Sequence, residues 1–245
     1  MAYCFKCKAG MEDGARFCDE CGAEQPQAIY CEECGAEIEP GVKFCDSCGA
    51  ETGQGAQPVK VDAEAAEAAY KRGVDFHKTE DYKNAIKAYT ESLKHNPNDA
   101  FTYLSRGDSY RENGELDLAL KDYNEAIRLE PNSELAYYGR GHVYNYKGDP
   151  EKAIADYTES IDIYSRNELA YSYRGGQYME IGEHDLAIKD FDKVIKLTPD
   201  DPEAYFDRGE AYQEKGEIYL AKKDFTKALQ LDPNFSPAKK ALAEL

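Results

Sequence analysis

The chain has 245 residues, enough for one or two domains of ordinary size. It carries 30 Lys and Arg against 48 Asp and Glu, a formal charge of −18, which argues against nucleic acid or an anionic membrane as its main partner, because phosphates are bound by clustered basic side chains. It has no apolar run of about 18 residues that could cross a membrane and no basic-then-apolar signal pattern at its start, so we expect a cytoplasmic protein that does not act on membranes.

All eight cysteines lie near the N-terminus and form four C-x2-C pairs, the last two of which repeat the first two after a shift of 27 residues. They are Cys4 and Cys7, Cys18 and Cys21, Cys31 and Cys34, and Cys45 and Cys48. Each half of this duplication is far shorter than the ~40 residues below which a hydrophobic core rarely supports a fold. We therefore expect metal binding to supply the folding free energy, on the order of 10–16 kcal/mol for structural zinc.

Four thiolates per unit form the tetrahedral soft-ligand set that Zn²⁺ prefers. Because all four ligands come from the protein, no coordination position stays open, which argues against metal catalysis. Disulfides would fit a secreted domain, and a thioredoxin-type motif needs a βαβ context that is missing here. Iron in the same thiolate set and thiol redox chemistry are the alternatives that these residues leave open.

The motifs YCxxC and FCDxCGA, each present twice, resemble a double zinc ribbon over residues 1–50, with units at 1–24 and 28–50. The resemblance implies two small β-hairpins and two structural zinc ions per chain, and ribbons of this kind bind nucleic acid or protein or simply stabilise a domain. Residues 1–51 hold four basic against eleven acidic residues, which argues against nucleic acid. Residues 51–61 contain Gly, Gln and Pro without periodicity and predict a flexible linker.

From residue 66 the sequence repeats every 34 residues, in units at 66–99, 100–133, 134–167, 168–201 and 202–235. The eighth position of every unit is Gly and the twentieth is Ala, whereas the fourth, eleventh and twenty-fourth positions are mostly Tyr or Phe. Gly near the middle of four units, followed by an acidic residue, predicts the turn between two helices. Small residues allow two helices to approach closely, and we expect the aromatic residues to fill the core between them.

This pattern closely resembles the tetratricopeptide repeat. The resemblance implies a mainly α protein whose residues 62–245 form an α–α superhelix of five helix pairs with a C-terminal capping helix at 236–245. We expect Ser236 to cap that last helix and Pro237 to be its first residue. Ala238, Ala241, Leu242 and Leu245 would then face the preceding repeat.

The seventh position of every repeat is Arg, where the family usually has Leu, and the twenty-third is Asp in all repeats except the first, which has Ala88. These positions face one another in an antiparallel helix pair. We therefore predict a ladder of bidentate Arg–Asp pairs joining Arg106 to Asp122, Arg140 to Asp156, Arg174 to Asp190 and Arg208 to Asp224. The alternative is a row of arginines that binds an acidic ligand.

The resemblance further implies that the first helices of the repeats line a peptide-binding groove. The candidate groove residues are Phe101, Leu104, Asp108, Arg111, Tyr138, His142, Asn145, Tyr146, Phe206, Glu210 and Gln213. Glu203, Asp207, Glu210 and Glu214 near the C-terminal end favour a ligand with basic and apolar residues. The four histidines are scattered and none has a Cys nearby, so we expect ordinary surface histidines.

No catalytic motif is present, and the hypothesis with most support is a non-enzymatic adaptor that binds a peptide or protein in the groove. Two alternatives stay open: a nucleic-acid-associated or ribosome-associated factor that uses the ribbons, and a zinc–thiol redox sensor. A monomer is favoured over an oligomer. The sequence does not identify the partner.

Overall fold

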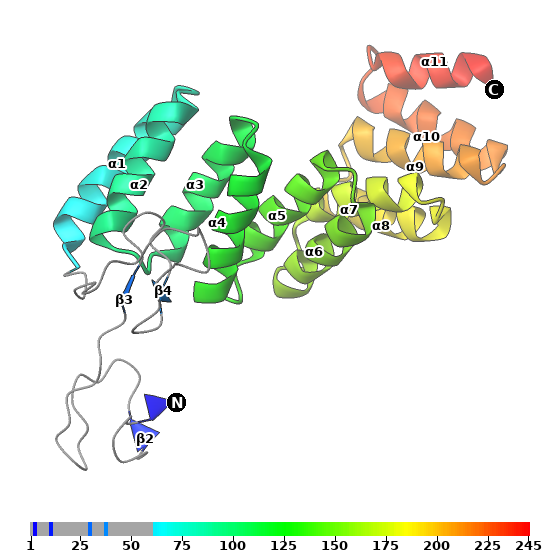
Figure 1. Ribbon diagram of the computed structural model, residues 1–245. Coiled ribbons are helices and arrows are strands. Elements are labelled where there is room, and N and C mark those ends of the chain that lie inside the picture. The colour runs from blue at the N-terminus through cyan, green and yellow to red at the C-terminus, as the bar shows by residue number, and fades with distance from the viewer. Residues whose placement is uncertain (1, 4–9, 12–28, 31–36, 39–60) are drawn as a thin grey trace.

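The computed structural model describes residues 2–3, 10–11, 29–30, 37–38 and 61–245 (Figure 1). The eight cysteines and residues 51–60 of the expected linker lie outside the described residues. From residue 61 onward the described chain is helical, as the 34-residue period predicts.

Two short antiparallel hairpins belong to the duplicated N-terminal segment. Strand β1 (Ala2–Tyr3) pairs with β2 (Gly10–Met11), and β3 (Ile29–Tyr30) pairs with β4 (Glu37–Ile38). Ala2 lies opposite Met11 in the first hairpin, and Ile29 lies opposite Ile38 in the second. The second register is thus the first one moved by 27 residues, the shift that also relates the cysteine pairs. Both β-hairpins expected from the sequence are therefore present.

The eleven helices of residues 61–245 form five antiparallel pairs and one final helix. They are α1 (Ala63–Lys78), α2 (Tyr82–His95), α3 (Ala100–Glu112), α4 (Leu116–Leu129), α5 (Glu134–Tyr146), α6 (Pro150–Ile163), α7 (Glu168–Glu180), α8 (His184–Leu197), α9 (Pro202–Glu214), α10 (Ile218–Leu231) and α11 (Ser236–Glu244). Figure 1 shows the pairs following one another in chain order, from α1 in cyan to α11 in red. The predicted superhelix with a C-terminal helix is confirmed.

The turns between the two helices of repeats two to five share one sequence and backbone pattern. Gly114, Gly148, Gly182 and Gly216 have positive φ, and an acidic residue then occupies the N-cap of the second helix. Asp149 is the member of this set whose side chain accepts a bond from a backbone N–H, that of Lys152. In the first repeat Glu80 takes the place of glycine and has a φ of 60°. That conformation is strained for a residue with a Cβ.

The expected cap of the last helix is wrong by one residue. The N-cap of α11 is Phe235, and Ser236 is already helical. The Phe235 ring packs edge-on against Phe206, with 5.5 Å between centroids, and this contact fixes the chain where the helix begins. Ala238 is fully buried, and Ala241, Leu242 and Leu245 pack against the same cluster as expected.

The core of each repeat is an aromatic ring pressed against a glycine. The rings at the twenty-fourth position are fully buried, namely Tyr89, Tyr123, Tyr157, Phe191 and Phe225. The eighth-position glycines leave them room: a Cβ on Gly209 would lie 2.5 Å from the Phe225 ring. The other aromatic positions are less uniform, since the eleventh-position residues stay half-buried or, for Phe76, exposed. The core prediction therefore holds fully for the twenty-fourth position alone.

The predicted Arg–Asp ladder is present in repeats two to five. Arg106 donates from Nε and Nη2 to the two carboxylate oxygens of Asp122 at 2.7 and 2.8 Å. The same two bonds join Arg140 to Asp156, Arg174 to Asp190 and Arg208 to Asp224, all at 2.7–2.9 Å. These arginines are occupied by structural pairs, which argues against a row of ligand-binding guanidiniums.

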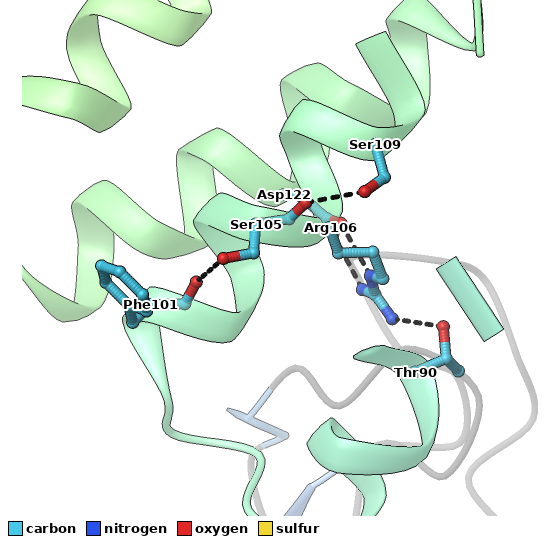
Figure 2. A network of polar contacts seen from close by, with 6 residues as sticks. All are labelled: Thr90, Phe101, Ser105, Arg106, Ser109 and Asp122. Carbon is cyan, nitrogen blue, oxygen red and sulfur yellow. Dashed lines mark hydrogen bonds and ion pairs between the residues drawn. The ribbon is translucent and has the colours of Figure 1, made fainter. Parts of the chain in front are cut away.

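Each ladder arginine also has a partner that the sequence did not suggest. Arg106 Nη1 donates to Thr90 Oγ1 at 3.0 Å, so its guanidinium joins α3 to both α4 and α2 (Figure 2). The equivalent Nη1 atoms of the next three arginines reach Asn124, Thr158 and Asp192 on the second helix of the preceding repeat. The ladder therefore joins the two helices within each of repeats two to five and links each of these repeats to the one before it.

Candidate interaction surface

None of the expected metal ligands is among the residues that the structure describes. All eight cysteines lie outside the described residues, and within the described ranges no group of three or more His, Cys, Asp or Glu could hold a metal ion. None of the helices in residues 61–245 is long and apolar enough to cross a membrane.

The odd-numbered helices lie on the inner side of the stack. α3 directly contacts α1 and α5, and α7 contacts α9, whereas the even-numbered helices mainly contact their own partner and the first helix of the next pair. Elements on the inside of a curved stack approach one another more closely than those on the outside. This places the candidate groove residues, all of which lie on odd-numbered helices, on the inner side.

The structure divides the eleven candidates by burial. Phe101, Tyr146 and Glu210 are exposed; Asp108, Arg111, Tyr138, Asn145, Phe206 and Gln213 are half-buried; Leu104 and His142 are buried. The expectation that the histidines are ordinary surface residues is wrong for His142, which is 6% exposed. Neighbouring aromatic rings cover this side chain.

At the N-terminal end of this face, side chains of neighbouring repeats bond to one another. Tyr70 Oη lies 3.3 Å from Ser105 Oγ, and His77 Nδ1 lies 2.9 Å from Ser109 Oγ. The Phe101 ring packs 5.9 Å from the Tyr70 ring but stays largely exposed.

Asp108 and Arg111 lie next along this face on α3. Tyr123 donates to Asp108 Oδ1 at 2.6 Å, and burial nevertheless raises the pKa of this carboxyl above its usual value. Arg111 pairs with Glu112 at 2.9 Å and more distantly with Asp108 at 3.6 Å. Its Nε atom is buried and has no hydrogen-bond partner in the described chain.

The middle of the face is a cluster of aromatic rings around His142. The ring centroids of Tyr173 and Tyr138 lie 4.0 and 4.7 Å from that of His142, and those of Tyr157 and Tyr146 lie 5.8 and 6.4 Å away. Burial, together with the charge of Arg111, lowers the pKa of His142 to about 4, so the imidazole is neutral at pH 7. The cluster therefore presents rings and no fixed charge of its own.

The C-terminal end of the face combines apolar packing with unpaired carboxylates. Phe206 packs between Phe225 and Phe235, with centroid distances of 5.6 and 5.5 Å. Burial, then the charges of Glu203, Glu210 and Asp201, raises the pKa of Asp207 to about 7. The structure records no hydrogen bond or ion pair for Asp207 within residues 61–245. No cation of residues 61–245 therefore pairs with Asp207.

Two residues of this face, Tyr173 and Gln177, were not among the candidates. Tyr173 contacts His142, and Gln177 Nε2 donates to Asn145 Oδ1 at 3.1 Å. They stand at the sixth and tenth positions of the fourth repeat. Tyr, Ser and Gly occupy the sixth position in different repeats, so the sequence carries no periodic signal there.

Comparisons with protein-family models agree with the repeat pattern. A TPR repeat model matches residues 107–145 and 175–216, and tetratricopeptide repeat models match 66–99, 88–121, 135–167 and 202–235. A double zinc ribbon model matches residues 4–49. No curated protein matches the chain.

Several solved structures share the fold. A crystal structure of MamA is 31% identical, with a TM-score of 0.65, and the alignment covers 75% of this chain and 98% of that one. YrrB, a TPR protein with an unusual peptide-binding site, is 20% identical, with 75% and 94% coverage and a TM-score of 0.65. MamA from Desulfovibrio magneticus RS-1 is 18% identical, with 71% and 98% coverage and a TM-score of 0.66.

Proposed function

Because the chain belongs to the tetratricopeptide repeat family and carries a double zinc ribbon, we propose that it is a non-enzymatic adaptor whose inner face binds a peptide or protein segment. Tetratricopeptide repeats are interaction scaffolds, and YrrB, which shares this fold, is itself described as having a peptide-binding site. The partner proposed here is a protein segment with apolar and basic residues.

The observation that carries this proposal is a stripe of exposed apolar side chains on three successive first helices. Phe101, Leu135 and Leu169 occupy the second position of repeats two, three and four and are 56%, 48% and 52% exposed. Apolar side chains that recur in register without being buried suggest a surface that a partner covers. Glu67 and Glu203 hold the same position at the two ends, which favours basic residues flanking the apolar part of the ligand.

Zinc binding is the second part of the proposal. Cys4, Cys7, Cys18 and Cys21 would hold one ion, and Cys31, Cys34, Cys45 and Cys48 the other. The donor set fits zinc because four thiolates complete a tetrahedral site, and the two hairpins show that both halves of the duplication have the same local register. The metal would stabilise the ribbons and take no part in a reaction. The acidity of residues 1–51 supports a protein contact over nucleic acid.

The test is a selection of phage-displayed random 12-residue peptides on the zinc-loaded full chain. Selected peptides are synthesised with a fluorophore and titrated by anisotropy against the wild type and the Phe101→Ser/Leu135→Ser variant. We expect the double substitution to weaken binding about tenfold or more, because it removes two exposed apolar contacts. Both side chains are largely exposed, so the fold tolerates the change.

Tyr219→Ser is the matched control, because Tyr219 is 80% exposed and lies on α10, an even-numbered helix. It should leave the affinity unchanged. A selection that enriches no peptide, or peptides that bind both variants alike, would contradict a peptide-binding role of the inner face.

A further inference from the structure

The aromatic cluster of the inner face consists of the rings of Tyr138, Tyr146, Tyr157 and Tyr173 around His142. Apart from Tyr146, all of these ring centroids lie no more than 6.0 Å apart in every pairing. The Tyr146 ring joins them through His142, with 6.4 Å between centroids. The rings come from α5, α6 and α7, and their mutual contacts place them in one contiguous group.

Part of this aromatic cluster is open to a partner. Tyr146 is 65% exposed and Tyr173 is 38% exposed, while Tyr138 is half-buried. Tyr146 stands at the thirteenth position of its repeat, and the other repeats have a charged residue there, namely Lys78, Glu112, Glu180 and Glu214. An exposed ring at a position that is otherwise charged has no packing role within the repeat and indicates a surface that a partner covers.

The tyrosine hydroxyls of the aromatic cluster have no hydrogen-bond partner within residues 61–245. The Tyr157 side chain is fully buried, and its Oη atom is nevertheless unpaired. The equivalent hydroxyl of the second repeat, on Tyr123, donates to Asp108 at 2.6 Å, whereas His142 replaces that carboxylate in the third repeat. Buried hydroxyls of folded proteins are usually paired. The cluster therefore holds donors that find no acceptor in the described part of the chain.

The charges on this part of the inner face favour an uncharged segment with basic residues beside it. The His142 imidazole is neutral at pH 7, so no group of the aromatic cluster attracts an ion. The carboxylates of Glu203, Asp207 and Glu210 lie on α9, the first helix after α7 on this face, and form no ion pair within residues 61–245. A cation next to the uncharged segment would therefore meet unpaired carboxylates.

We propose that the aromatic cluster binds a proline-rich segment of a partner protein in the polyproline II conformation, flanked by basic residues. Proline has no backbone N–H, so such a segment brings carbonyl acceptors without donors of its own, which complements the unpaired hydroxyls. Its pyrrolidine rings pack on aromatic faces, and its backbone is already extended before binding, which lowers the entropy cost.

The dimensions of the cluster agree with this ligand. Tyr138 and Tyr146 lie eight residues apart on α5, or about 12 Å along the helix axis, a distance that about four residues of polyproline II span. The site rests on the proposed peptide-binding function and specifies the class of peptide.

The test measures fluorescence anisotropy with the zinc-loaded full chain and four fluorescein-labelled peptides. The first has ten prolines between two arginines. The second replaces the prolines with N-methylglycine, which also lacks the N–H but has no ring, and the third replaces them with alternating alanine and glycine. The fourth keeps the prolines and replaces the arginines with glutamates. We expect the first peptide to bind about tenfold or more tightly than the second and third, and several-fold more tightly than the fourth.

Two variants and one control separate the aromatic cluster from general charge attraction. Tyr146→Ser/Tyr173→Ser removes the two exposed rings and should weaken the arginine-flanked proline peptide about tenfold or more. Tyr138→Phe/Tyr173→Phe keeps both rings, removes two hydroxyl donors and should weaken it several-fold. Tyr219→Ser removes an exposed tyrosine from α10 and should leave the affinity unchanged, and circular dichroism checks that every variant keeps its helix content.

Two results would overturn the site: equal binding of the proline and N-methylglycine peptides, or equal binding of the proline peptide to wild type and Tyr146→Ser/Tyr173→Ser. Selected phage peptides that lack proline and lose affinity only in Phe101→Ser/Leu135→Ser would leave the proposed function intact and overturn the proline site. Proline-peptide binding that is lost in Tyr146→Ser/Tyr173→Ser but unchanged in Phe101→Ser/Leu135→Ser would support the proline site and contradict the apolar stripe as the surface that carries the proposed function.

Discussion

The first repeat differs from the four that follow it at the positions that define them. Repeats two to five have Tyr at the fourth position, Asp at the twenty-third and Gly in the turn between their helices, where the first repeat has Ala69, Ala88 and Glu80. Arg72 keeps the ladder position, but it is exposed and has no aspartate opposite. The first repeat therefore has the helix pair without the polar ladder.

The comparison of the first repeat with the other four indicates that the Arg–Asp ladder joins each repeat to the repeat before it. Each ladder arginine reaches back to the second helix of the repeat before it, as Arg106 reaches Thr90. None of the described residues before Val61 is helical, and several residues of α1 away from the inner face are exposed and polar, namely Glu64, Lys71, Arg72 and Asp75. A polar outer face suits the end of a repeat array. The other end is covered instead by α11, whose Ala238 is fully buried.

The largest expected effect on the free energy of unfolding is the difference between alanine substitutions at two arginines, Arg106 and Arg72, which hold the same repeat position. Arg106→Ala leaves the buried Asp122 carboxylate without its partner and should lower the free energy of unfolding by about 3–5 kcal/mol. Arg72→Ala removes an exposed side chain and should change it by no more than about 0.5 kcal/mol. Urea unfolding followed by circular dichroism measures both values.

The double variant Arg106→Ala/Asp122→Ala tests the reason for that loss. If an uncompensated buried charge causes it, removing both partners should cost less than removing the arginine alone. A double variant that is less stable than Arg106→Ala would show instead that the side chains stabilise mainly by packing.

The glycine beside the core ring is a feature that the first repeat shares with the others. A Cβ on Gly73 would lie 2.5 Å from the Tyr89 ring, and one on Gly107 would lie 3.1 Å from the Tyr123 ring. Gly73→Ala should therefore cost about 2–3 kcal/mol and Gly107→Ala about 1 kcal/mol, because overpacking outweighs the helix propensity of alanine. Thermal unfolding of both variants gives the comparison. Equal losses would show that the ring of the first repeat moves aside freely.

The periodic part of the fold could be predicted because each residue repeats its environment every 34 positions. Gly, Ala and aromatic positions located both helices, and the Arg and Asp positions, sixteen residues apart, predicted the bidentate pairs correctly. The third partner of each arginine was missed because the side-chain type varies among Thr90, Asn124, Thr158 and Asp192. Their common feature is a place on the neighbouring repeat, which a single repeat does not encode.

The inner face was harder to predict because its contacts join residues about one repeat apart that differ from repeat to repeat. His142 was expected at the surface, but Tyr138 and Tyr173 cover it. In the second repeat, Asp108 accepts a bond from Tyr123 at the position that His142 occupies in the third. Substitution at one position thus changes the partner of a core hydroxyl, and only the three-dimensional packing shows which contact results.

A substitution in the turn of the first repeat should have a smaller effect on the free energy of unfolding, and it should raise this energy instead of lowering it. Glu80 holds a left-handed conformation that Gly114 holds in the second repeat, so Glu80→Gly should raise the free energy of unfolding by about 0.5–1 kcal/mol. Gly114→Ala should lower it by about 1 kcal/mol, since nothing crowds its Cβ position and strain alone acts. Urea unfolding of the two variants measures the pair. A loss of stability in Glu80→Gly would show that the glutamate side chain has a stabilising role in this turn.

The smallest expected effect is on the helical unfolding midpoint, and it tests whether the zinc ribbons pack against α1. If its polar outer face is adapted to water, removing zinc from the ribbons should leave the helical unfolding midpoint unchanged to within about 1 °C. EDTA treatment of the full chain, with released zinc measured by a colorimetric chelator and helix content by circular dichroism, tests this and should yield two zinc ions per chain. A clear fall in the midpoint would show that the zinc-loaded ribbons pack on the first repeat. Arg72 and its neighbours would then form an internal interface, and the first repeat would differ from the others because it contacts the ribbons.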